Sequence, residues 1–216
     1  MLVREIMTRP VVAIGPDEPI GDVIALMEQR RLRHFPVVDD GRLVGIVSDR
    51  DLRTVGSEHP KARPDVRRRD AVRAIMTESV WTAHPLDPID EAAAVLRRQT
   101  IGAMPVVDGD DLIGIVTASD FLDALVRMTG VGRSSTRLEV ELPNRPGALA
   151  GLLTHVASRG ANVASVLTTR SDPEAVVFVL RVGTIDGRSL AHALREAGYE
   201  VAWPPADAAR ETARTA

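Results

Sequence analysis

Apolar and polar positions in the first 128 residues follow two periods, which predict short strands alternating with helices. Helical spacing follows Pro19 and Pro88, and proline is tolerated at the start of a helix. The turns at residues 39–41 and 108–110 place Asp and Gly between β-branched runs, which predicts two β-hairpins. Extended segments are expected at residues 11–14, 35–38, 43–47, 80–83, 104–107 and 112–116. The apolar positions of the two helices are Ile20, Val23, Ile24, Met27, Ile89, Ala93 and Leu96.

The same region contains an internal duplication. Met7 and Met76 are 76 − 7 = 69 positions apart, and the same offset relates Asp51 to Asp120. Because one register holds without a gap for about 50 residues, we expect two copies of one fold. The last helix of each copy is expected to begin after Ser48 or Thr117, with the aspartate three residues later completing a capping box.

A third pattern occupies residues 136–203. Strand-like alternation at 136–142 is followed by helical spacing from Leu149 to Val156, and Gly160 is expected to end that helix. Strands at 161–169 and 175–182, a helix at 190–197 and a final short strand complete a βαββαβ order. The sequence therefore predicts an α/β (α+β) chain with a separate C-terminal module.

Breaks in periodicity suggest the boundaries between these parts. Residues 54–70 contain Gly, two Pro and Arg67-Arg68-Arg69, which favours a solvated connector or a basic contact for a phosphate or a partner. Residues 129–135 are small and polar, as in a flexible linker. We expect repeat 1 at 1–58, a linker at 59–70, repeat 2 at 71–128, a linker at 129–135, a third domain at 136–203 and a flexible tail at 204–216.

Composition excludes several classes of function. The chain has no cysteine, so it can form neither disulfides nor thiolate zinc sites, and its five histidines show no metal-ligand spacing. With 27 basic and 30 acidic residues, no overall charge attracts nucleic acid or anionic membranes. Because neither a signal core nor an apolar run of membrane-spanning length is present, a cytoplasmic protein is expected.

Residues 45–51 and 114–120 each carry Gly, two apolar residues, Ser or Thr, two variable residues and Asp. This pattern, together with the duplication, resembles the tandem CBS domain pair over about residues 1–128. The resemblance implies two repeats packed sheet to sheet, with clefts that bind AMP, ATP or a related adenosyl ligand. The implied nucleotide-binding residues are Arg33, His34, Phe35, Pro36, Ser48, Arg50, Asp51, Met104, Pro105, Thr117 and Asp120.

Asp51 and Asp120 are expected to accept the ribose hydroxyls, and Ser48 and Thr117 to contact phosphate. A cap alone would select the same residue types, so the helix-capping alternative stays open. Only the first repeat has cations before its strand, at Arg33 and His34, which makes it the better phosphate site. The second is expected to hold a nucleoside, an uncharged adenosyl compound or no ligand.

The segment Pro143-Asn144-Arg145-Pro146-Gly147-Ala148-Leu149, with Gly160-Ala161-Asn162-Val163, resembles an ACT domain over about residues 136–203. The resemblance implies a ferredoxin-like fold that dimerises through its sheet and binds an amino acid near the first strand-to-helix loop. The alternative is a turn whose Pro and Gly serve only geometry. The implied ligand-binding residues are Asn144, Gly147, Ala148, Leu149, Asn162 and Val163.

Two CBS repeats followed by an ACT domain resemble regulatory proteins of the acetoin-utilisation type. The sequence therefore predicts a homodimeric regulatory sensor, with an adenine nucleotide as regulatory ligand and no obligatory cofactor. The rival hypothesis is a structural adaptor that binds no metabolite and assembles dimers or a partner enzyme. A free-standing enzyme is disfavoured, since the sequence shows no nucleophile–base pair, metal cluster or phosphate loop.

Overall fold

The computed structural model describes residues 1–55, 63, 65–131, 135–184 and 186–206. It divides into two compact units, within residues 1–124 and 125–216. The expected linkers fall partly outside the described residues, at 59–62, 64 and 132–134, as does most of the expected tail, at 207–216.

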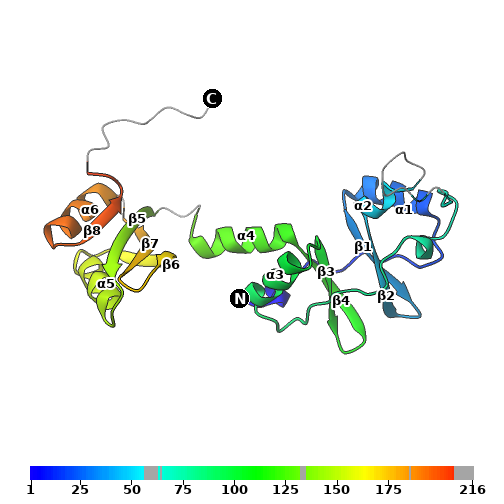
Figure 1. Ribbon diagram of the computed structural model, residues 1–216, viewed down its shortest axis with the longest axis horizontal. Coiled ribbons are helices and arrows are strands. Elements are labelled where there is room, and N and C mark those ends of the chain that lie inside the picture. The colour runs from blue at the N-terminus through cyan, green and yellow to red at the C-terminus, as the bar shows by residue number, and fades with distance from the viewer. Residues whose placement is uncertain (56–62, 64, 132–134, 185, 207–216) are drawn as a thin grey trace, which may run out of the picture. The chain divides into compact units, whose positions relative to one another are not determined.

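The first unit contains the same elements twice, and the helix, the hairpin and the second helix of each copy follow the predicted order (Figure 1). In each copy a 3₁₀ turn and a helix precede a two-stranded antiparallel hairpin and a second helix. The first copy comprises η1 (Val3–Glu5), α1 (Ile20–Arg30), β1 (His34–Asp39), β2 (Arg42–Ser48) and α2 (Asp49–Leu52). The second comprises η2 (Val72–Ala74), α3 (Ile89–Arg98), β3 (Ala103–Asp108), β4 (Asp111–Thr117) and α4 (Ala118–Thr129).

Both expected hairpins are confirmed. Asp39 pairs with Arg42, and the two turn residues between them, Asp40 and Gly41, have positive φ of 46° and 79°. Two positive φ values are the signature of a type I′ turn, whose twist matches the strands. The helices are also confirmed, since α1 and α3 begin directly after Pro19 and Pro88. In α3 the buried alanine is Ala92, whereas the expected Ala93 is only half-buried.

The expected strands at 11–14 and 80–83 are wrong in extent, because each is reduced to one bridge, Ile14 to Val37 or Ala83 to Val106. Ile14 donates to the Pro36 carbonyl at 3.0 Å, and the Val38 N–H donates back at 2.9 Å. In a parallel ladder the next donors would be residues 36 and 16, and both are proline. Proline has no N–H, so the ladder stops on both sides, and Pro105 and Pro85 have the same effect in the second copy.

The two repeats exchange their N-terminal segments. Val3 and Ile6 pack in the core of the second repeat, with Ile89 and Met104. Val72 and Ile75 pack in the core of the first repeat, with Ile20 and Phe35 among its other residues. Isolated antiparallel bridges pair Thr8 with Ile115 and Thr77 with Ile46, and so join each N-terminal segment to a strand of the other repeat. Each hydrophobic core is therefore completed by residues from the other copy.

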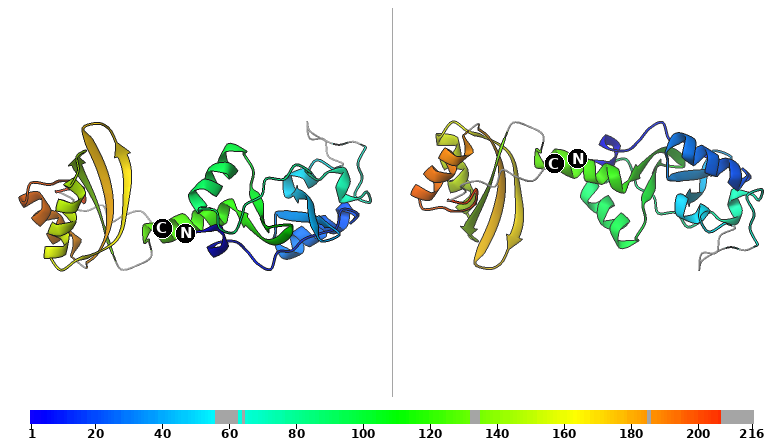
Figure 2. Two further views of the ribbon diagram at one scale, coloured as in Figure 1. Left: turned by 90° about the horizontal axis from the view of Figure 1, so that it is seen from below. Right: turned by 90° about the horizontal axis from the view of Figure 1, so that it is seen from above.

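The second unit is a four-stranded antiparallel sheet in the order β6-β7-β5-β8. Figure 2 shows both of its helices on one face of that sheet. This is the expected ferredoxin-like βαββαβ fold, with Leu138, Val140 and Leu142 of β5 buried beneath the helices. Its elements are β5 (Thr136–Pro143), α5 (Ala148–Ser158), β6 (Asn162–Ser171), β7 (Ala175–Gly183), α6 (Gly187–Glu196) and β8 (Glu200–Trp203).

Helix α6 begins three residues earlier than the expected start at Leu190. The Asp186 carboxylate accepts a hydrogen bond from the Ser189 N–H at 2.9 Å and so caps the helix before Gly187. The expected end of α5 is confirmed, because Gly160 follows it with a positive φ of 70°.

Two glycines make the exchange between the repeats sterically possible, and substituting them tests it. A Cβ at Gly114 would lie 2.8 Å from Met7 Sδ and 3.1 Å from the Thr8 carbonyl oxygen, and one at Gly45 would lie 2.7 Å from Met76 Sδ. We expect Gly45→Ala and Gly114→Ala each to lower the free energy of unfolding by about 1–3 kcal/mol, because overpacking forces backbone to move. Urea titration followed by circular dichroism measures the loss.

Gly15→Ala is the matched control, because its added Cβ would meet no atom closer than 3.8 Å and should change stability little. Equal urea midpoints for all three variants and the wild type would show that the exchanged segments do not pack tightly.

Candidate functional site

The first candidate site lies where each β-hairpin of the first unit leads into its second helix. Ser48 Oγ donates to Asp51 Oδ2 at 2.6 Å, and the Ser48 N–H donates to the same oxygen at 2.9 Å. Thr117 and Asp120 repeat this arrangement, with both distances at 2.7 Å. The expected capping boxes are therefore present in both repeats.

The capping boxes fix the aspartates without using the whole carboxylate. Both hydrogen bonds of each box go to Oδ2. Among the described residues, no donor reaches Oδ1 of Asp51 or Asp120. The cap accounts for the Ser/Thr–Asp pairing and leaves one preoriented acceptor oxygen in each repeat.

His34 lies at the contact between the repeats. A Cβ on Gly102, in the second repeat, would be 2.7 Å from His34 Nε2, so the absence of a side chain at Gly102 makes room for the imidazole. Burial lowers the pKa of His34; nearby Asp49 and Asp51 act to raise it, and Arg33 and Arg50 act to lower it. The imidazole is therefore within electrostatic range of two carboxylates and two guanidinium groups.

The cations around His34 are not neutralised by acids. Asp49 is paired with Arg53. Arg33 and Arg50 are exposed, and neither makes an ion pair within the part of the chain that the structure describes. The end of the first hairpin thus carries two unpaired guanidinium groups beside the fixed Asp51 carboxylate.

The second repeat keeps the aspartate and loses the charges. At the offset of 69, Arg33 and His34 correspond to Gly102 and Ala103. Other charged positions of the first repeat are also replaced by neutral residues: Asp49 by Ala118, Arg50 by Ser119 and Arg53 by Leu122. The two repeats therefore share one backbone design but present different electrostatic environments.

Four of the expected nucleotide-binding residues are inside the protein. Phe35 and Met104 are 0% and 1% exposed and belong to the two cores. Pro36 and Pro105 are also buried, and each accepts a backbone hydrogen bond from the single bridge before its strand. In this structure the four residues hold β1 and β3 in place and do not face solvent.

In the second unit, the expected ligand residues are not gathered at one place. The Asn144 amide donates to the Asp172 carbonyl at 2.7 Å and so ties the loop after β5 to the turn after β6. Leu149 and Val163 pack against the core, and Asn162 begins the edge strand β6. Only Gly147 and Ala148 line the pocket found in this unit.

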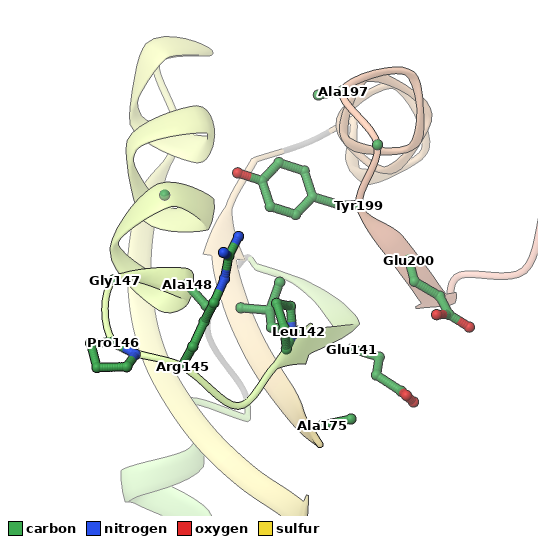
Figure 3. A pocket seen from close by; sticks show the side chains of 13 residues that line it. Glu141, Leu142, Arg145, Pro146, Gly147, Ala148, Ala175, Ala197, Tyr199 and Glu200 are labelled. Atoms are coloured by element: carbon green, nitrogen blue, oxygen red, sulfur yellow. The ribbon is translucent and has the colours of Figure 1, made fainter. Parts of the chain in front are cut away.

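That pocket has a volume of about 720 Å³ and lies between the N-terminus of α5 and the turn from α6 into β8. Figure 3 shows Arg145 extending along the first turn of α5 toward Tyr199, while Glu141 and Glu200 point away at the rim. Tyr199 is held by His155, whose Nδ1 lies 3.2 Å from the phenol oxygen. The lining residues are Glu141, Leu142, Pro143, Arg145, Pro146, Gly147, Ala148, Gly151, Ala175, Ala197, Gly198, Tyr199 and Glu200.

Arg145 and Tyr199 were absent from the sequence-based candidates. Arg145 occurs within the very loop that indicated a site, and Tyr199 is the single tyrosine of the chain, directly after Gly198 with its positive φ of 88°. An isolated aromatic residue after a glycine turn was the signal that could have found it.

Two absences concern the described residues alone. No group of three or more His, Asp or Glu residues there is placed to hold a metal ion. No helix in the same residues combines the length and the apolar character needed to cross a bilayer.

Comparison with known families agrees with the repeat structure. The CBS domain family matches residues 3–58 and 72–127, together more than half of the chain. The TTHA0829-like ACT domain family matches residues 134–202.

Among curated proteins, a CBS domain-containing protein of Dictyostelium discoideum is 33% identical over 135 residues, covering 59% of this chain and 93% of that protein. An inosine-5′-monophosphate dehydrogenase of Thermoplasma acidophilum is 36% identical over 118 residues, which are 54% of this chain and only 22% of the enzyme. CBS domains thus occur both in small proteins and as a minor part of enzymes.

Solved structures resemble the first unit. The CBS domain pair of protein MJ0100, in complex with 5′-methylthioadenosine and S-adenosyl-L-methionine, is 28% identical with a TM-score of 0.51, covering 58% of this chain and 95% of that one. CBSX2 in complex with AMP is 26% identical with a TM-score of 0.52, covering 61% and 99%. A Vibrio cholerae protein named for acetoin utilization, AcuB, is 30% identical with a TM-score of 0.50, covering 61% and 94%.

The duplicated hairpins with their capping boxes, the family matches and the shared fold lead to one assignment. The chain belongs to the CBS domain family, as a tandem CBS pair followed by a C-terminal ACT-like domain.

Proposed function

We propose that this protein is a non-catalytic regulatory sensor whose CBS pair binds an adenine nucleotide at the first repeat. The observation that carries this proposal is the Asp51 carboxylate, fixed by Ser48, at the same end of the hairpin as the unpaired guanidinium groups of Arg33 and Arg50. Similar CBS pairs in complex with AMP or with adenosyl compounds support the ligand class.

Different residues of this site contact different groups of the nucleotide. The free Oδ1 of Asp51 can accept a ribose hydroxyl, since a carboxylate oxygen has two lone pairs. Arg33, Arg50 and His34 supply the positive charge that a phosphate requires, and arginine suits its geometry. Phe35 and Pro36 act from within the fold by holding the strand in place.

The second repeat fits a different ligand. Asp120 keeps a preoriented oxygen, with Met104 and Pro105 as its structural supports, but Gly102, Ala103 and Ser119 bring no charge. A phosphate there would lack a cationic partner, so the second repeat is suited to a nucleoside or an uncharged adenosyl compound.

Regulation requires that the ligand favour one arrangement of the protein over another. Because the two repeats complete each other's cores and His34 contacts Gly102, a ligand at the first repeat acts directly on the second. The ACT-like unit adds an amino-acid site. Its occupancy can affect nucleotide binding only if the amino acid binds one arrangement of the protein more tightly than another. We also propose a homodimer, since β6 is an edge strand of ten residues that pairing with a second copy would cover.

The structure also gives one reason to retain the adaptor alternative. The capping boxes alone account for Ser48, Asp51, Thr117 and Asp120, without any ligand. In that case the three modules only assemble copies or a partner protein. An absence of binding heat for AMP, ATP and S-adenosyl-L-methionine would favour the adaptor.

Asp51→Asn tests the ribose contact. We expect AMP affinity, measured by isothermal titration calorimetry, to fall at least about ten-fold, because a buried charge-assisted hydrogen bond contributes about 1.5–3 kcal/mol. Ser48 remains the N-cap, and the asparagine side-chain oxygen can still accept from the Ser48 N–H, so the fold should persist. Asp120→Asn removes the same group from the other repeat and should leave AMP affinity unchanged; equal losses in the two variants would contradict the assignment to the first repeat.

The environment of His34 predicts that AMP binding depends on pH. Burial holds the pKa of free His34 below its usual value, whereas a bound phosphate would raise the pKa by favouring the imidazolium. A group whose pKa rises on binding takes up a proton, so AMP affinity should increase as the pH falls from 8 to 6.5. Titrations at several pH values measure the slope.

Adenosine, which has no phosphate, should bind without this slope, and His34→Gln should flatten it for AMP. A slope that persists in His34→Gln would assign the proton uptake to another group.

A further inference from the structure

Met7 and Met76 occupy equivalent positions in the two exchanged segments, at the offset of 69 residues. Each is half-buried and packs against the core of the opposite repeat. The residue that follows each methionine forms the isolated bridge to the second strand of that repeat, β4 or β2. Both thioethers therefore lie where an exchanged segment meets the strand that holds it.

Each of these sulfurs lies against a glycine of the opposite repeat and beside a carbonyl oxygen. A Cβ on Gly114 would be 2.8 Å from Met7 Sδ and 3.1 Å from the Thr8 carbonyl oxygen. For a Cβ on Gly45, Met76 Sδ and the carbonyl oxygen of the next residue would be at 2.7 Å and 3.2 Å. Neither of these neighbours, a thioether or a carbonyl, is a hydrogen-bond donor, so the contact suits an apolar sulfur.

Oxidation would change the chemistry of this contact. A peroxide transfers one oxygen atom to the thioether sulfur: an S–O bond forms, the peroxide O–O bond breaks, and hydrogen peroxide leaves as water. The sulfur loses two electrons and the peroxide gains them. The resulting sulfoxide is polar and disrupts the packing of methionine interfaces. A methionine sulfoxide reductase reverses the step with two thiols, which become a disulfide while the oxygen leaves as water.

The other four methionines differ from this pair in exposure. Met1 and Met128 are 47% and 48% exposed, so a sulfoxide there only adds a polar atom to the surface. Met27 and Met104 are 6% and 1% exposed and belong to the repeat cores, which protects their sulfurs from a peroxide. The chain has no cysteine, so no thiolate competes for the oxidant. Only the half-buried pair combines access to an oxidant with a contact that the sulfoxide would disturb.

We propose that Met7 and Met76 are a paired site of reversible oxidation, at which a peroxide loosens the exchange between the two repeats. Each sulfoxide sets an acceptor oxygen beside a glycine backbone and a carbonyl oxygen. Because the exchange also places His34 beside Gly102, its loosening reaches the first candidate site. That last consequence rests on the proposed nucleotide sensing, whereas the oxidation site itself does not.

Hydrogen peroxide titration of the full chain, with peptide mapping by mass spectrometry, tests the site. We expect Met7 and Met76 to be oxidised after the two exposed methionines and well before the two core methionines. As both sulfoxides form, the urea midpoint of unfolding should fall. Incubation with methionine sulfoxide reductases and dithiothreitol should remove the added oxygen and restore the midpoint.

The double variant Met7→Leu/Met76→Leu separates this effect from oxidation elsewhere. Leucine has nearly the volume of methionine, so the fold should persist, and circular dichroism before oxidation checks it. Peroxide should then leave the urea midpoint of the double variant unchanged. If the double variant does not fold, each single variant should show about half of the wild-type shift, since one of two equivalent sulfurs remains. Met128→Leu is the matched control: it removes an exposed sulfur outside the exchange and should lose stability on oxidation as the wild type does.

The proposal is overturned by unmodified Met7 and Met76 at a dose that fully oxidises Met128. It is equally overturned if both sulfoxides form and the urea midpoint does not move, or if peroxide lowers the midpoint of Met7→Leu/Met76→Leu as much as that of the wild type. AMP titrations of reduced and oxidised protein keep the two proposals distinct. An absence of heat in both states would refute nucleotide sensing and leave the oxidation site in place.

Discussion

The structure of the CBS pair depends on one steric constraint, the close approach of each N-terminal segment to the glycine in the other repeat's second strand. Met7 lies against Gly114 and Met76 against Gly45, at distances that leave no room for a side chain. The neighbouring residues Val3 and Val72 are fully buried in the opposite repeat. This exchange brings the start of β1 against the start of β3, and so places His34 beside Gly102 and beside the acids of its own repeat.

Much of this fold could be predicted, because the same pattern of apolar and turn residues occurs twice at a constant offset of 69 residues. Each copy therefore supports the elements predicted from the other. Hairpin turns and helix starts followed from local chemistry at Gly41, Pro19 and Pro88. The extent of the short strands was predicted wrongly, although Pro16 and Pro36 already contained the reason. The exchange could not be predicted, since Val3 and Val72 are apolar residues that would fit either core, and only tertiary packing decides between them.

The two candidate sites also differ in how far they could be predicted from the sequence. Asp51 and Ser48 belong to one turn, so their hydrogen bonds follow from a spacing of three residues. The pocket in the ACT-like unit depends instead on where β8 stops along β5, which no local pattern encodes. Sequence reasoning therefore located the loop at Gly147 and Ala148 but missed Tyr199, about 50 residues away along the chain.

The reciprocal burial of Val3 and Val72 also affects what happens when the two repeats are separated, and how the pair could have evolved. A single repeat cut from this chain would carry the N-terminal segment that packs in the other repeat's core. It would lack the segment that completes its own core. Its exposed valine and the vacant interior would then favour capture of another copy, with two separate halves rebuilding the pair between molecules. Gene duplication of an ancestral self-associating half would reach the present chain by joining such partners end to end.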